Sequence, residues 1–379
     1  MMTDTRPPRL SRSLHPMAWW LWALGLATAA SRTSDPLLLG LVIAVCACVV
    51  AARRGDAPWA LAFRYYLIAG ALVVVLRVLA RIVFGTGPGT VVLLDLPQVP
   101  LPDWTSGVTL LGPVSADAVL GGLYDGLRLA TMLVCVGAAN ALANPKRLLK
   151  SMPPALHEVA TAVVVALSVL PQLAESVLRV RRARELRGPH RGRRALLRSV
   201  VVPVLEDALD RSLLLAASMD ARGYGRSGDR TAAGRWVASG LMLLGLVGVA
   251  AGVYGVLDAS TPTVLRGPAL LVGVLAAVGG FTLAGRAVRR TTYQPDRWRP
   301  AELVTVLAGI VPAATLVLLS ARGMPALVPD VSPPSWPTAP LLPVAVILVA
   351  LLPAVLAPPP LRSTPPARNP AATLRGATT

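Results

Sequence analysis

Two arginines, Arg187 and Arg222, each stand directly before a glycine at the end of a helix-forming stretch. Glycine beyond the last turn permits the left-handed cap that ends a helix, and an arginine beside it complements the negative end of the helix dipole. The guanidinium offers five donors in a planar fork, which suits carboxylate or carbonyl oxygens of another protein. A single Arg-Gly ending is an ordinary helix C-terminus. Two matched endings, 35 residues apart, favour a pair of docking points.

Other chemical motifs do not combine into a site. The chain has no G-x-x-x-x-G-K-[ST] sequence, and Lys146 and Lys150 follow no glycine-rich loop, so we expect no nucleotide site in this chain alone. His157-Glu158 lacks the second histidine of a zinc-protease helix, and the three histidines are far apart in sequence. No G-x-S-x-G sequence occurs. We therefore predict a non-catalytic protein with no cofactor and no metal site.

The composition indicates that membrane helices position these arginines. Apolar residues make up 54% of the 379 residues, charged residues only 15%, and mean hydropathy is +0.61. A soluble protein carries about 25% charged residues. The three cysteines lie in apolar stretches, which predicts small buried side chains rather than disulfides. The predicted fold class is an all-α polytopic membrane protein with a cytoplasmic coupling-helix hairpin.

Runs of about 20 apolar residues are long enough to cross a bilayer. We expect about eight such spans and divide the chain into N-terminal transmembrane helices (1–144), a cytoplasmic coupling region (145–235), C-terminal transmembrane helices (236–357) and a Pro-rich disordered tail (358–379). The expected spans are Met17–Ser31, Pro36–Ala52, Ala60–Phe84, Ala118–Asn144, Trp236–Leu257, Gly267–Gly285, Leu303–Ala321 and Pro337–Leu361.

The basic residues predict the orientation of these spans. The chain has 37 Lys+Arg against 19 Asp+Glu, a net charge of +18. If the N-terminus is cytoplasmic, the cytoplasmic segments hold 30 of the 37 basic residues, and the split is still 13 to 3 without the long segment 145–235. This is the positive-inside pattern. We therefore expect a plasma (inner) membrane protein with both termini cytoplasmic, and the basic charge requires no nucleic acid.

Two further segments are less regular. Three arginines precede the apolar run 17–31, as in a secretory signal peptide, but three tryptophans in that run and a second span five residues later favour a retained helix. The outer loop 85–116 is rich in Gly and Pro, which predicts irregular structure.

Five charged residues fall at the outer ends of predicted spans. An ionisable group at membrane depth is a candidate for a substrate pathway, although charges at span ends commonly snorkel or pair across neighbouring helices. We favour structural pairing for this set: Arg77, Arg81, Asp117, Asp125 and Arg128.

The coupling region predicts two helices, 155–187 and 195–225. On the second, Leu205, Leu209, Leu213 and Ala216 share one stripe, while Asp207 and Arg211 can pair at i,i+4 on the other face. Each helix ends at one of the Arg-Gly pairs, in the sequences RRARELRG (181–188) and SMDARGYG (218–225).

These two sequences resemble the paired Ala-Arg-Gly signatures of the transmembrane T component of energy-coupling factor (ECF) transporters, the EcfT/CbiQ family. His15-Pro16, Pro171 and the run at 290–298 extend the resemblance over roughly 15–300. One departure is Leu186, where the family usually has alanine.

The resemblance implies a scaffold that couples two cytoplasmic ABC ATPases to a membrane S component binding a vitamin or a transition-metal ion. It implies that the ATPases dock on Leu186, Arg187, Gly188, Ala221, Arg222 and Gly223, with Arg184 and Asp220 in support. Two alternatives stay open: an ion-coupled secondary transporter and a membrane anchor without a transport role.

Overall fold

The computed structural model is almost entirely helical, which confirms the predicted all-α class. It forms two compact units, Met1–Leu148 with Asp296–Thr379, and Leu149–Pro295. The residues described are 12–55, 61–84, 91–97, 99–100, 109–152, 156–186, 193–224, 232–257, 262–286, 298–332 and 336–359. Most of the predicted tail, 360–379, therefore lies outside the described residues.

The first unit contains the helices of both ends of the chain. They are α1 (Pro16–Ser31), α2 (Pro36–Arg53), α3 (Phe63–Val83), α4 (Ala116–Leu142), α10 (Pro300–Ala321), the 3-10 helix η4 (Pro325–Leu327), α11 (Leu341–Val349) and α12 (Leu352–Leu356). The short α5 (Pro145–Lys150) crosses the boundary between the units. The second unit contains α6 (His157–Glu185), α7 (Arg193–Ala221), α8 (Ala232–Leu257) and α9 (Thr263–Arg286).

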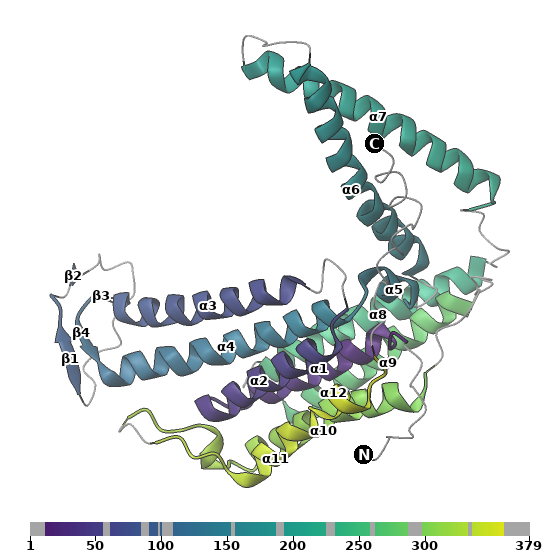
Figure 1. Cartoon of the computed structure of the whole chain (residues 1–379). Helices are drawn as coiled ribbons and strands as arrows, with labels where there is room; N and C mark the ends of the chain where they lie inside the picture. Colours follow the sequence, from purple (N-terminus) through teal and green to yellow (C-terminus); the bar gives the residue numbers. More distant parts are fainter. Residues whose placement is uncertain are drawn as a thin grey trace, which may run out of the picture. The chain divides into compact units, whose positions relative to one another are not determined.

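The core of the first unit is built around α1, which packs against both α4 and α10 (Figure 1). Trp22 and Leu26 are fully buried there. Two glycines make the close approach possible, because a Cβ on Gly25 would lie 2.3 Å from the carbonyl oxygen of Gly309. The Trp22 indole donates to the carbonyl of Ala350, which lies between the end of α11 and the start of α12. The run 17–31 is thus a core helix, as the retained-helix interpretation expects.

Among the described residues, seven helices are long and apolar enough to cross a membrane, with a shorter apolar helix over Leu341–Leu356. Six of the seven coincide with predicted spans, and the seventh is Glu158–Ala183 in α6, which we had placed in the cytoplasmic region. With 16 residues, α1 is shorter than these seven helices, each of which has at least 18 residues. The protein is a multi-pass membrane protein.

The second unit consists of two antiparallel helix pairs, α6–α7 and α8–α9. In the α8–α9 pair a Cβ on Gly245 would lie 2.4 Å from the backbone nitrogen of Ala277, so only glycine fits there. Pro171 and Pro203 lie inside α6 and α7. The chain divides differently from the sequence segments we expected, because α10–α12 join the N-terminal helices while α8 and α9 join the coupling helices.

The loop 85–116 contains strands where we expected irregular chain. β1 (Val92–Asp95) pairs antiparallel with β4 (Pro113–Ser115), with Val92 opposite Ser115. β2 (Val99–Pro100) pairs with β3 (Thr109–Leu110). The prediction from Gly and Pro content was therefore wrong for these residues, since the valines and leucines between the turn residues favour extended chain.

Candidate docking site

The end of α7 has the cap predicted from its sequence. Gly223 takes a left-handed φ of 72°. Its N–H donates to the carbonyl of Asp220 at 2.8 Å, and the Tyr224 N–H donates to that of Met219 at 3.0 Å. This pair of bonds is a Schellman motif, which satisfies carbonyls that a helix end otherwise leaves unpaired. The direction of the chain at Arg222 is therefore fixed by backbone bonds.

The predicted docking residues at this end are exposed. The side chains of Asp220, Ala221 and Arg222 lie on the surface, and Gly223 is half-buried. An arginine held at a rigid, exposed helix end presents its fork to a partner with little further loss of conformational freedom.

The first signature is described only in part. Leu186 directly follows α6, and its side chain is 90% exposed. Its N–H donates to the carbonyl of Arg182 at 3.4 Å, which continues the helical pattern. The backbone of Arg184 lies in α6, but its side chain is outside the described residues, as are Arg187 and Gly188 altogether.

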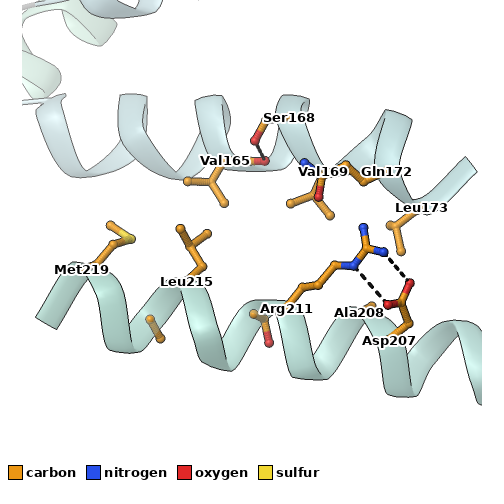
Figure 2. Close-up of a pocket in the computed structure, with 12 residues that line it drawn as sticks. Val165, Ser168, Val169, Gln172, Leu173, Asp207, Ala208, Arg211, Leu215 and Met219 are labelled. Atoms are coloured by element: carbon orange, nitrogen blue, oxygen red, sulfur yellow. Dashed lines mark hydrogen bonds and ion pairs between the residues drawn. The ribbon is translucent and has the colours of Figure 1, made fainter. Parts of the chain in front are cut away.

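An open groove of about 440 Å³ runs between α6 and α7 (Figure 2). Its walls are mostly apolar, with polar groups from Gln172, Asp207 and Arg211. The ion pair predicted between Asp207 and Arg211 is confirmed, at 2.9 Å. This mixed face of α7 is the one turned to α6. Of the predicted stripe, Ala216 lines the groove. The three leucines do not line it and are exposed, with Leu205 at 55%, Leu209 at 62% and Leu213 at 67%.

Four of the five charged residues singled out in α3 and α4 have protein partners. Arg81 and Asp125 form an ion pair at 2.8 Å between α3 and α4. Arg128 donates to the carbonyl of Ser31, and the Ser332 hydroxyl donates to Asp117. These contacts support structural pairing for the four residues involved. Among the residues described, no group of three or more His, Cys, Asp or Glu side chains is placed to hold a metal ion.

Residues just before α1 contact the start of α10, a contact that the sequence patterns did not predict. The rings of His15 and Trp298 stack with centroids 5.1 Å apart. Arg12 forms an ion pair with Glu302, whose side chain is 2% exposed and also accepts from the Arg299 N–H. The spacing of Arg299 and Glu302 around Pro300 is that of a helix N-terminus with a glutamate in its first turn, a signal that was available in the sequence.

A second Ala-Arg-Gly sequence, Ala321-Arg322-Gly323, ends α10 and lies outside both signatures. The sequence analysis did not single out this ending. Gly323 has a φ of 68°, and the same two backbone bonds close the cap.

Comparison with protein families identifies the group to which this architecture belongs. The model of the cobalt transport protein family CbiQ matches residues 9–232. The chain belongs to the CbiQ cobalt transport family. A search of curated proteins found no match. The CbiQ match includes both signatures and ends at the start of α8, so α10–α12 lie beyond it although they share a unit with α1–α4. CbiQ membership makes this chain a transport protein of the membrane, and the family is not one of enzymes.

Proposed function

We propose that this CbiQ-family protein is the membrane scaffold and energy-coupling subunit of an ECF-type ABC importer for a vitamin or a transition-metal ion. Two cytoplasmic ABC ATPases dock on the ends of α6 and α7, and a membrane S component binds the substrate. The observation that carries the proposal is the exposed Arg222 on a backbone-fixed helix end. In the sequence, Arg187 has the corresponding position in the first signature, two residues after the last residue of α6.

Contacts in the first unit support the orientation that the charge pattern predicts. Arg147 donates to Ser13, the Arg12 N–H donates to the carbonyl of Pro359, and Arg53 donates to the carbonyl of Ala354. Segments expected on the cytoplasmic side are thus neighbours of one another. On the other side, the hydroxyl of Thr33 donates to the carbonyl of Leu327. We infer that both termini are cytoplasmic, in the plasma (inner) membrane.

The mechanism requires the chain to transmit force and to bind no nucleotide itself. Each guanidinium donates to carboxylate or carbonyl oxygens in an ATPase groove, and such charge-assisted contacts contribute about 1.5–3 kcal/mol each. Closure of the ATPases on ATP moves the two helix ends together. The exposed leucines of α7, centred on Leu209, offer an apolar surface through which the movement reaches the S component.

The test is recovery of ATPases with the tagged protein from detergent extract, with mass spectrometry of the chains that co-purify. Arg187→Ala combined with Arg222→Ala is expected to lower recovery at least tenfold, since about 1.4 kcal/mol corresponds to a factor of ten. Arg322→Ala is the matched control, because the same tripeptide and cap occur there, and recovery is expected to be unchanged. Wild-type recovery in the double variant would contradict the proposal.

A further inference from the structure

A polar contact joins the two coupling helices at mid-length. The Ser176 hydroxyl of α6 donates to Asp207 Oδ2 of α7 at 2.7 Å, and the side chain of Ser176 is buried. Arg211, one turn along α7, donates from Nε to Asp207 Oδ1 at 3.1 Å and pairs with Oδ2 at 2.9 Å (Figure 2). Both carboxylate oxygens of Asp207 are therefore bound, one of them from the facing helix.

The surroundings of Asp207 lower the pKa of its carboxyl group. The hydrogen bond from Ser176 is the main cause that lowers the pKa of Asp207 below its ordinary value, and the positive charges of Arg211 and Arg179 add to it. A lowered pKa means that the carboxylate is fully charged at neutral pH. The contact weakens only as the pH falls through that lowered value.

Apart from this contact, most of the residues that line the groove between α6 and α7 are apolar. Val165, Val169 and Leu173 of α6 face Leu215 and Met219 of α7 across the groove. Apolar burial is non-directional, so such faces tolerate sliding and rotation at little cost. A hydrogen bond with a fixed donor and acceptor is directional. The Ser176–Asp207–Arg211 contact is therefore the part of this surface that specifies one crossing of the helices.

We propose that Ser176, Asp207 and Arg211 are positioning residues that set the crossing of α6 and α7, and with it the separation of the two arginine-bearing ends. This inference rests on the proposed coupling function. At 1.5 Å per residue, Arg222 lies about 22 Å from Asp207 along the helix. We call the Ser176–Asp207–Arg211 contact the joint. A rotation of α7 by about 10° at the joint would displace the Arg222 end by about 4 Å, which is more than a hydrogen bond tolerates.

Two substitutions test the joint, each with a matched control on the same helix. Ser176→Ala removes the hydroxyl that bonds α7, whereas Ser168→Ala removes one that bonds the carbonyl of Val165 in its own helix. Asp207→Asn weakens the joint, whereas Asp210→Asn changes an exposed carboxylate one turn away. Size-exclusion profiles of the purified proteins establish that each variant is folded.

The first measurement does not depend on transport. Spin labels at Leu186→Cys and Tyr224→Cys, in a background without Cys46, Cys48 and Cys135, report the distance between the helix ends. We expect a narrow distribution in the parent protein and in both controls. In Ser176→Ala it should broaden or shift by several ångströms, and in Asp207→Asn more. Unchanged distributions in both joint variants would overturn the inference.

The second measurement is substrate uptake per ATP hydrolysed, by the complete transporter in proteoliposomes. A severalfold fall in this ratio is expected in the joint variants, with ATPases still co-purifying and both controls unaffected. Distances that change while the ratio stays at the wild-type value would overturn the coupling role of the joint. Failure of the proposed function itself is recognised separately, because no ATPase would then co-purify with the wild-type protein while the distances still report on the joint.

Discussion

The ends of α7 and α10 have the same sequence and the same cap, yet very different surroundings. Ala-Arg-Gly occurs at 221–223 and again at 321–323. Gly223 and Gly323 have φ values of 72° and 68°. The N–H two residues after the arginine donates to a carbonyl at 3.0 Å in α7 and at 3.2 Å in α10. The tripeptide therefore specifies a helix cap wherever it occurs.

What differs is the packing of the helix that carries the cap. Beyond α10 the chain turns into η4, where Leu327 is 1% exposed and its carbonyl accepts from Thr33 and Ser34. In the C-terminal half of α7, by contrast, the side chain of Leu213 is 67% exposed. Ala321, Arg322 and Gly323 are exposed, but the chain that follows them enters a buried cluster at Leu327, whereas α7 has an exposed apolar face. Under the proposed function, docking requires the cap, the arginine and an exposed helix together.

The largest expected effect concerns this difference in packing. Leu327→Ala should destabilise the first unit by about 2–5 kcal/mol, because it leaves a cavity in a buried cluster. Leu213→Ala should change stability by no more than about 0.5 kcal/mol, because the side chain is exposed. The apparent Tm in detergent measures both. Equal shifts would mean that α7 is packed as tightly as the end of α10.

Substitution of the two cap glycines should have effects of intermediate size. Alanine at either Gly223 or Gly323 must adopt a left-handed conformation that costs about 1–2 kcal/mol, so both caps should weaken alike. At Gly323 the added Cβ meets nothing within 4 Å, so the effect there is backbone strain alone. Only Gly223→Ala should reduce ATPase recovery, severalfold, because only that cap aims a docking arginine. A similar reduction with Gly323→Ala would remove the distinction.

Local features of this fold were predictable from local sequence. The cap at Gly223 and the ion pair of Asp207 with Arg211 depend on residues within one or two turns, and both predictions are confirmed. Most membrane helices are likewise evident from runs of apolar residues. The docking role of Arg187 and Arg222 stays a prediction.

Long-range contacts were not predictable from these patterns. The stacking of His15 on Trp298 and the approach of Gly25 to Gly309 join residues more than 280 positions apart. Periodicity shows that a helix has an apolar face but not which helix covers it. The same limit applies to α7, where the pattern defined an apolar stripe but not the face that packs on α6, which is the mixed face containing Asp207.

The smallest expected effect separates charge from geometry at the α7 end. Arg222→Lys keeps the positive charge but replaces a planar fork by a single ammonium group, so paired hydrogen bonds to a carboxylate are lost. We expect the affinity for the ATPases to fall about threefold to tenfold, less than for the alanine variant. The reason is that lysine loses about one hydrogen bond to the carboxylate, and one hydrogen bond contributes about 0.5–1.5 kcal/mol. Binding measured with purified ATPases at two salt concentrations gives the comparison, with Arg322→Lys as the control at the same cap. If the lysine variant binds the ATPases as tightly as the parent protein at both salt concentrations, residue 222 contributes its positive charge alone. The fixed backbone direction that Gly223 gives to Arg222 would then have no part in docking.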